Sequence, residues 1–326
     1  MAFKDIYGHE KPIRILQQAM SGNRIAHAYL FYGMEGIGKR STALVFAKAL
    51  NCQEGQGEAC GHCSSCLKAD HGNHPDLRII EPAGQSIRVQ EIRDIQQQMA
   101  FRPFEGGWRT FILVDAEKMN SIAANALLKT LEEPTPFNII ILVSSRPYRF
   151  LLTVLSRCQP LRFNPLTRET VELYLQERLS IPNDTARLLA ASSGGSIGRA
   201  IEMNDADYLS LRNQMLEEVL APQRQDPLRL FSIIHTFGQE RKDILERLDI
   251  LRMCFRDALV FKETGMIHSL FNQDRTPEIQ SFARSHSAAD LLKNIQIVDR
   301  AYGAIDQNAN KSLTLEAMMF RLAPKS

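Results

Sequence analysis

The stretch AYLFYGMEGIGKRS, residues 28–41, decides the fold of this chain. Its first five residues form a compact apolar and aromatic run, which predicts a buried strand. A glycine-rich segment follows, and residues 41–50 carry the pattern of a helix. A strand, a glycine-rich turn and a helix in this order are the setting of a phosphate-binding loop.

The glycine-rich segment fits the pattern G-x-x-x-x-G-K, with Gly33, Gly38 and Lys39 at the fixed positions and Gly36 between them. Glycines let backbone N–H groups point at phosphate oxygens, and the helix N-terminus adds its dipole. Lys39 supplies a positive charge for the β- and γ-phosphates. We therefore expect a cradle for ATP or ADP, with a strand–helix turn that binds nothing as the alternative.

The residue after the loop lysine departs from this pattern. A serine or threonine there would ligate Mg²⁺, but the chain has Arg40, with Ser41 one position late. One helical position corresponds to about 100° of rotation, so Ser41 is a poor substitute. Arg40 and Ser41 stay candidate nucleotide contacts, and we expect Mg²⁺ to be weakly ordered.

A second predicted strand, residues 111–114, leads into Asp115 and Ala116. An aspartate at the end of such a strand orders Mg²⁺, and the next position of a nucleotide hydrolase normally holds the glutamate that polarises the attacking water. Alanine has no proton acceptor, so the sequence predicts a site that holds ATP without the base. Glu117 is a weaker candidate for a displaced base, because on an extended strand it would share a face with Asp115.

Other apolar runs predict strands at residues 77–80 and 139–143. Helical patterns lie between and before the strands, at residues 12–20, 41–50, 89–100 and 122–131. Continuous apolar strands separated by helices are typical of a parallel sheet that is covered on both faces. We predict an α/β P-loop domain with a parallel sheet over residues 1–165.

The pattern changes after residue 165. Helices are predicted at residues 168–179 and 184–191, and Gly194 and Gly195 should then break the chain. From about residue 206 the pattern is helical throughout. We predict a small helical lid domain over residues 166–205 and an all-α C-terminal domain over residues 206–326.

The bulk composition excludes some classes of protein. A net charge of +2 over 326 residues is too balanced to argue for nucleic acid or membrane binding. The N-terminus is charged and lacks the apolar stretch of a signal peptide. The longest aliphatic run, residues 139–143, is far too short to span a bilayer. We expect a cytoplasmic protein without a membrane partner.

Four of the six cysteines fall within fifteen residues. Without a secretion signal, such a cluster indicates a metal site rather than disulfides. Four thiolates suit a tetrahedral and closed Zn²⁺ site, which is structural rather than catalytic. An iron–sulfur pattern would need a further cysteine followed by proline, but residues 67–70 are LKAD. We predict a zinc module at residues 52–66 with ligands Cys52, Cys60, Cys63 and Cys66, against free surface thiols as the alternative.

These pieces together resemble the bacterial clamp-loader family of the AAA+ superfamily. The resemblance is clear over about residues 3–200, and over the rest of the chain it extends to the predicted order of domains. It includes RIAHAYLFYGMEGIGKRS, the inserted CGHCSSC, NALLKTLEEP at residues 125–134 and SRC at residues 156–158. The last two strings are specific to the clamp-loader branch, whereas the phosphate loop alone occurs in many nucleotide hydrolases. The resemblance implies that the C-terminal helical domain joins an oligomeric collar.

The resemblance also separates motor subunits from a stationary one. Motor subunits carry Asp-Glu at the strand end, Ser or Thr after the loop lysine, and an arginine two residues after the serine of a Gly-Ser pair. This chain has Ala116 and Arg40 at the first two sites, and Gly198 at the third, with Arg199 one place late. The resemblance therefore implies a stationary subunit of the DNA polymerase III holoenzyme, which itself does not hydrolyse ATP.

The SRC string is the family's arginine-finger motif. The resemblance implies that Arg157 reaches the γ-phosphate held by a neighbouring motor subunit, where it stabilises the charge on the transferring phosphoryl group. The implied partners are the gamma/tau motor subunits and a delta subunit in a pentameric complex. Through that complex, the partners include the sliding clamp and primer-template DNA. Glu132 and Glu133 are interpreted as the exposed end of the helix before Pro134, with a catalytic carboxylate pair as the alternative.

Two other functions stay open. One is an active clamp-loader ATPase of the gamma/tau type, which the residues at positions 40, 116 and 198 disfavour. The other is a free-standing, zinc-containing nucleotide-binding protein, which the strings at residues 125–134 and 156–158 disfavour.

Overall fold

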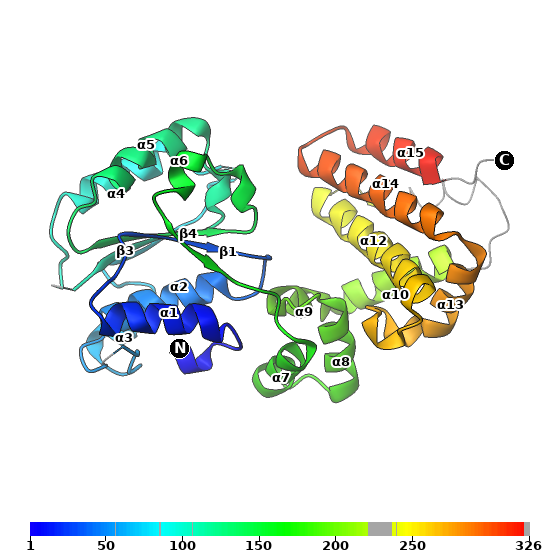
Figure 1. Ribbon diagram of the computed structural model, residues 1–326, viewed down its shortest axis with the longest axis horizontal. Helices are drawn as coiled ribbons and strands as arrows, with labels where there is room; N and C mark the ends of the chain where they lie inside the picture. The colour runs from blue at the N-terminus through cyan, green and yellow to red at the C-terminus, as the bar shows by residue number, and fades with distance from the viewer. Residues whose placement is uncertain (56, 85, 106, 221–236, 239, 323–326) are drawn as a thin grey trace. The chain divides into compact units, whose positions relative to one another are not determined.

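The computed structural model describes residues 1–326 except 56, 85, 106, 221–236, 239 and 323–326 (Figure 1). The chain divides into two compact units. Unit 1 consists of Met1–Tyr174 and Gly195–Arg199, and unit 2 of Leu175–Gly194 and Ala200–Ser326.

Unit 1 is built on one five-stranded sheet in which all paired strands are parallel. The strand order is β2-β3-β4-β1-β5, so β1 lies between β4 and β5. The strands are β1 (Ala28–Tyr32), β2 (Leu77–Ile80), β3 (Arg109–Leu113), β4 (Asn138–Ser144) and β5 (Gln159–Arg162). The predicted α/β class with a parallel sheet is confirmed.

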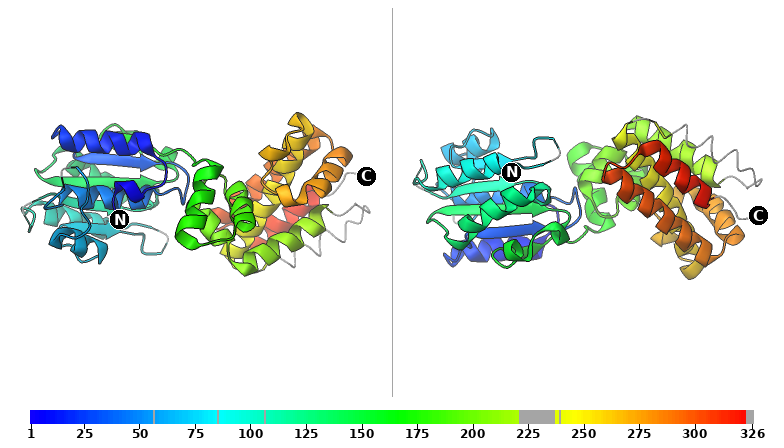
Figure 2. Two further views of the ribbon diagram at one scale, coloured as in Figure 1. Left: turned by 90° about the horizontal axis from the view of Figure 1, so that it is seen from below. Right: turned by 90° about the horizontal axis from the view of Figure 1, so that it is seen from above.

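Helices cover both faces of this sheet, and the two views of Figure 2 show them from opposite sides. They are α1 (Glu10–Ser21), α2 (Lys39–Leu50), α3 (Ser64–Asp70), α4 (Val89–Met99), α5 (Ser121–Glu132) and α6 (Leu152–Leu155). Short 3-10 turns are η1 (Phe3–Asp5), η2 (Ala116–Lys118) and η3 (Pro147–Arg149). Figure 1 places α1, α2 and α3 on one face and α4, α5 and α6 on the other.

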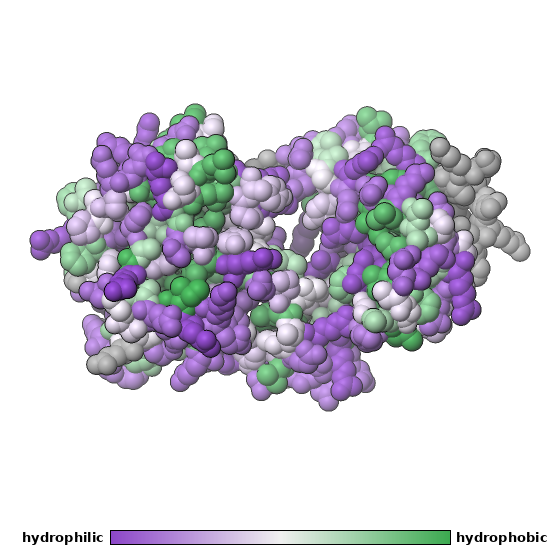
Figure 3. All heavy atoms as spheres, viewed as in Figure 1, coloured by the Kyte–Doolittle hydropathy of each residue, from purple (hydrophilic) through white to green (hydrophobic). Residues whose placement is uncertain are grey.

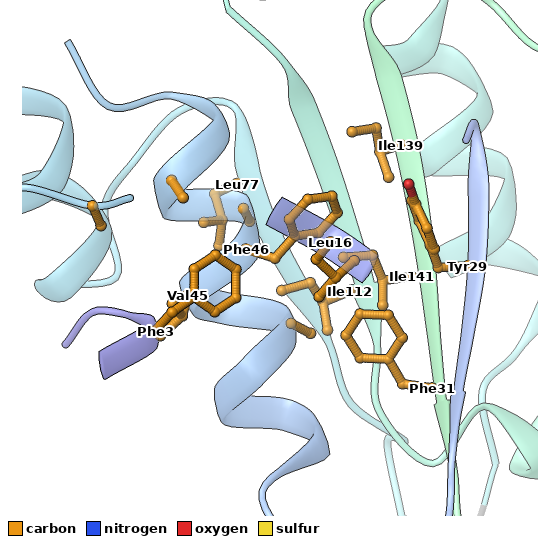
Figure 4. Close-up of a cluster of buried hydrophobic side chains, with 14 of the residues drawn as sticks. Phe3, Leu16, Tyr29, Phe31, Val45, Phe46, Leu77, Ile112, Ile139 and Ile141 are labelled. Carbon is orange, nitrogen blue, oxygen red and sulfur yellow. The ribbon is translucent and has the colours of Figure 1, made fainter. Parts of the chain in front are cut away.

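Each face of the sheet has its own hydrophobic core, because successive residues of a strand point to opposite faces. Tyr29, Phe31 and Ile141 point toward α1 and α2 and belong to one buried cluster (Figure 4). Leu30 and Leu142 belong to the cluster beneath α4 and α5. The central strands are therefore buried on both faces, which explains their continuous apolar sequences.

Unit 2 is helical throughout the part that the structure describes. Its main helices are α8 (Asn183–Ser192), α10 (Ala206–Leu220), α12 (Arg241–Thr264), α13 (Thr276–Ser285), α14 (Ala288–Asp306) and α15 (Lys311–Leu322), with 3-10 turns η4 (Ile267–Ser269) and η5 (Gln273–Arg275). Helix α12 packs against α10, α13 and α14. Two more helices, α7 (Arg168–Leu179) and α9 (Ile197–Met203), contribute residues to both units. Within the described residues, we find no helix that is long and apolar enough to cross a membrane.

Candidate functional site

The glycine-rich loop joins the end of β1 to the start of α2, as the sequence predicts. Lys39 is the first residue of α2, and Gly38 before it adopts a left-handed conformation with φ 103°. The buried His9 braces the loop from the N-terminal segment, because its Nε2 lies 2.5 Å from the carbonyl oxygen of Ile37. Burial lowers the pKa of His9, which favours the neutral ring. The sequence carries no motif that singles out this histidine.

Lys39 is held by its own loop. Its ammonium group donates hydrogen bonds to the carbonyl oxygens of Gly33 at 2.8 Å and Met34 at 2.6 Å. Only 6% of the residue is exposed. Burial lowers the pKa of Lys39 to about 8, although nearby carboxylates, led by that of Glu35, act in the opposite direction. The charge of Lys39 is thus held by two carbonyl oxygens of its own loop.

Arg40 lies away from the loop lysine's hydrogen-bond partners. Its guanidinium pairs with Glu81, just past the end of β2, at 2.6 Å. Both side chains are more than half exposed. Ser41 follows on α2, and the buried Thr42 donates from its hydroxyl to the carbonyl oxygen of Gly38 at 2.9 Å. The position after the loop lysine therefore carries a cation that is paired with Glu81.

A second segment of unit 1 lies directly on the loop. The hydroxyl of Ser196 donates to the carbonyl oxygen of Glu35 at 2.8 Å, and the N–H of Gly198 donates to that of Gly36 at 2.8 Å. A Cβ atom added to Gly198 would lie 2.7 Å from the Cα of Gly36. The glycine at position 198 therefore allows this close approach, because a side chain there would push the two segments apart. No local sequence pattern predicts this contact.

The strand that precedes Asp115 ends earlier than predicted, at Leu113. Asp115 adopts a left-handed conformation with φ 49°, and its carboxylate accepts from the ammonium group of Lys118 at 2.9 Å. Ala116 is completely buried in the core beneath α4 and α5. Position 116 therefore faces the hydrophobic core.

Glu117 lies in the 3-10 turn η2, so the extended geometry considered for a displaced base is not present. Its Oε1 accepts from the backbone N–H of Ser145 at 3.2 Å and from the hydroxyl of Ser145 at 2.9 Å. Its Oε2 is buried, and no described residue donates a hydrogen bond to it. One oxygen of this carboxylate is thus committed to the residue that follows β4.

The four predicted metal ligands come together. Their sulfur atoms all lie within 4.8 Å of one another, and those of Cys60 and Cys66 are 3.9 Å apart. Four sulfurs at 2.3 Å from a zinc ion form a tetrahedron with edges of about 3.8 Å. The cluster, formed by Cys52, Cys60, Cys63 and Cys66, therefore matches the dimensions of a metal site.

Backbone donors favour the thiolate form at Cys52 and Cys63, whereas burial raises the pKa of the Cys66 thiol to about 12. Although burial alone raises the pKa of Cys63, hydrogen bonds from the backbone of Gln53 and Cys66 and from neighbouring thiols bring it down to about 6. The N–H of Cys60 also donates to the sulfur of Cys52, at 3.3 Å. N–H donors around a thiolate are a feature of sites that hold a cation with sulfur ligands.

Arg157 follows the short helix α6 on the surface of unit 1. Its guanidinium donates to the carbonyl oxygen of Thr153 at 2.8 Å and to the hydroxyl of Ser156 at 3.3 Å. It also forms an ion pair with Glu132, the last residue of α5, at 2.7 Å. Glu132 is the exposed end of α5, as predicted. The ion pair is an additional contact, and no local motif predicts it because its two partners are far apart in the sequence.

Comparisons with known proteins agree on one family. A family described as "DNA polymerase III, delta subunit" matches residues 8–167, and one described as "DNA polymerase III, delta subunit, C terminal" matches residues 206–323. The chain is 30% identical to DNA polymerase III subunit delta′ of Bacillus subtilis, over 95% of this chain and 94% of that protein. It is 39% identical to subunit delta′ of Pseudomonas aeruginosa, over 60% of each chain.

The matches extend to other subunits. The chain is 26% identical to DNA polymerase III subunit tau of Bacillus subtilis, over 99% of this chain and 62% of that protein. Among solved structures, a DNA polymerase III gamma-subunit-related protein from Thermotoga maritima aligns over 96% of this chain and 98% of that chain, with 19% identity and a TM-score of 0.44.

Proposed function

The chain belongs to the DNA polymerase III delta′ family and is a clamp-loader subunit, and from this premise we propose that it is the stationary subunit. In this role it hydrolyses no ATP itself and donates Arg157 to the ATP site of a neighbouring motor subunit. Its relatives include subunits named tau and gamma, so the proposed neighbours are the gamma/tau subunits. A delta subunit, the sliding clamp and primer-template DNA complete the proposed pentameric assembly.

The surface position of Arg157 is the observation that carries the proposal. An arginine finger acts in trans, so it must lie where another subunit can cover it. In the segment that leads to Arg157, Tyr148 is 78% exposed and Leu152 is 81% exposed. Figure 3 shows hydrophobic side chains gathered over the part of unit 1 that Figure 1 labels α6. Exposed apolar side chains in the segment that contains Arg157 support an interface at this part of the unit.

Three features support the absence of hydrolysis by this chain. Arg40 occupies the place of a Mg²⁺ ligand and pairs with Glu81. Ala116 offers no proton acceptor and lies in the core. Gly198 offers no side chain to the phosphates and lies against Gly36. Changes at three separate parts of the ATP site favour a subunit that does not itself hydrolyse ATP.

We also propose that the cradle still binds ATP or ADP, with little help from Mg²⁺. Gly33, Gly36, Gly38 and Lys39 would hold the phosphates, with Arg40, Ser41 and Asp115 at the margin of the site. The buried charge of Lys39 supports this proposal, since an anion would compensate it. Titration of the isolated chain with ATP or ADP in a calorimeter, with and without Mg²⁺, distinguishes this binding from a loop that no longer binds nucleotide.

For the cysteine cluster we propose structural Zn²⁺. Four thiolates leave no open coordination position for water, so the ion would stabilise the module and take no part in a reaction. The arrangement of the sulfur atoms supports this proposal.

The finger is tested in the assembled complex with Arg157→Ala. The variant chain should fold and assemble, while ATP hydrolysis at the site that Arg157 completes should fall on the order of 10³-fold, because the transition-state charge loses its partner. Arg149→Ala, which removes another exposed arginine of unit 1, is the matched control and should retain activity. Unchanged hydrolysis in the Arg157→Ala complex would refute the finger.

The same preparations discriminate the other candidates. Rapid ATP turnover by the isolated chain would indicate an active ATPase of the gamma/tau type. Failure to co-purify with gamma/tau subunits would indicate a free-standing nucleotide-binding protein.

A further inference from the structure

The guanidinium of Arg157 is folded back onto its own chain. One terminal nitrogen donates to Thr153 and Ser156, and the other pairs with Glu132 at 2.7 Å. One third of the arginine side chain and half of the glutamate side chain are exposed. Both ends of the guanidinium fork are therefore occupied before any partner arrives.

The acceptors of this fork are firmly placed. Glu132 follows Leu131, and Thr153 precedes Val154; both of these apolar neighbours are buried in the same core. Glu132 is also the last residue of α5, where the unpaired carbonyl groups of a helix create a negative potential. A carboxylate at this end is unfavourable unless a cation compensates it. Arg157 is a cation that compensates it.

We propose that Glu132 is a positioning residue that holds Arg157 back in the free subunit and is exchanged for a phosphate oxygen when a neighbouring subunit presents bound nucleotide. The inference rests on the proposed finger role of Arg157. A terminal phosphate carries more charge than a carboxylate and offers several oxygens to a guanidinium fork. The exchange therefore favours docking onto a nucleotide-loaded neighbour over docking onto an empty one.

Glu132→Gln removes the competing charge while it keeps the shape of the side chain. The full-length variant should bind a gamma/tau subunit that is loaded with a non-hydrolysable ATP analogue roughly two- to fivefold more tightly, the range expected for an ion pair at a partly exposed site. Its affinity for the nucleotide-free subunit should not change. Glu133→Gln is the matched control, because it removes the same charge one residue away and Glu133 forms no ion pair among the described residues.

A second arm separates the holding role from a general effect of surface charge. In an Arg157→Ala background, Glu132→Gln should have no effect on either affinity, because the glutamate acts only through the arginine. Equal affinities of the wild type and Glu132→Gln, or a gain that persists without Arg157, would overturn the inference. If Arg157→Ala by itself leaves complex ATP hydrolysis unchanged, the finger itself is refuted. Loss of hydrolysis in Arg157→Ala with no effect of Glu132→Gln would refute only the holding role.

Discussion

At the scale of single residues, the site at the end of β3 depends on backbone conformation as much as on composition. The sequence shows that position 116 lacks a base, and the structure shows that this position points into the core. Glu117 occupies the tight turn instead and binds Ser145. A glutamate introduced at position 116 would bury a charge, so restoring the sequence motif would not restore the geometry.

The buried charge of Lys39 makes a prediction about pH. The pKa of Lys39 in the folded chain is about 8, below its ordinary value of 10.5. The unfolded chain therefore binds more protons between these values, and the penalty for burying the charge disappears as the pH rises from 8 toward 10.5. Relative to Lys39→Met, the wild type should gain about 2.5 kcal/mol in free energy of unfolding between pH 7 and pH 10.

Urea unfolding followed by the fluorescence of Trp108, the single tryptophan of the chain and a residue of unit 1, measures this difference. Lys129→Met is the control, since Lys129 lies on an exposed face of α5. That variant should differ from the wild type by the same amount at both pH values. A pH-independent difference for Lys39→Met as well would show that the charge of Lys39 is not buried in solution.

At the scale of elements, the sequence predicted the central strands because burial on both faces leaves a continuous apolar run. Residues 28–32 match β1, and residues 139–143 fall within β4. The edge strand β5 was not predicted, because three of the four residues of QPLR are exposed and one is proline. The start of β3 was also missed, since Arg109 is polar. In the structure Arg109 is buried and paired with Asp76 at 3.1 Å.

The candidate site residues, like the strands, divide into those that a local sequence pattern predicts and those that it does not. The loop glycines, Lys39 and the four cysteines belong to local patterns, so the sequence alone predicts them as candidate site residues. The approach of Gly198 to Gly36 joins segments that are distant in the chain. The ion pair between Glu132 and Arg157 also depends on the packing of α5 against α6. No pattern within one segment encodes contacts of this kind.

The cysteine cluster spans the end of α2 and the start of α3, and a metal would fix both. Cys60→Ser should reduce zinc from about one ion per chain to nearly none, because a neutral hydroxyl is a poor replacement for a thiolate. The thermal midpoint of unit 1 should fall, since metal binding free energy contributes to folding. Atomic absorption and Trp108 fluorescence measure the two effects.

Cys158→Ser is the control for this change. Cys158 is buried in the other core of unit 1 and lies outside the cluster, so the variant should retain its zinc. The assignment of the metal site fails if the purified wild type contains no metal.

At the scale of the whole molecule, the chain combines two units with separate cores. The hydrophobic clusters around the sheet belong to unit 1. The core of unit 2 instead surrounds a buried carboxylate on α12. Asp257 accepts from the backbone N–H groups of Phe271 and Asn272, from the side-chain amide of Asn272, and from the guanidinium of Arg256. Separate cores of this kind favour separate unfolding transitions.

Asp257→Ala should therefore destabilise unit 2 alone. The substitution leaves buried donors without an acceptor, which costs about 3 kcal/mol or more. Circular dichroism, which is dominated by the helices, should show an earlier transition, whereas Trp108 fluorescence and zinc content should report an unchanged unit 1. Asp299→Ala, which removes a half-exposed partner of Arg252, should alter neither signal. A joint shift of both signals in Asp257→Ala would mean that the two units unfold as one, and that damage to the helical unit reaches the nucleotide cradle and the finger.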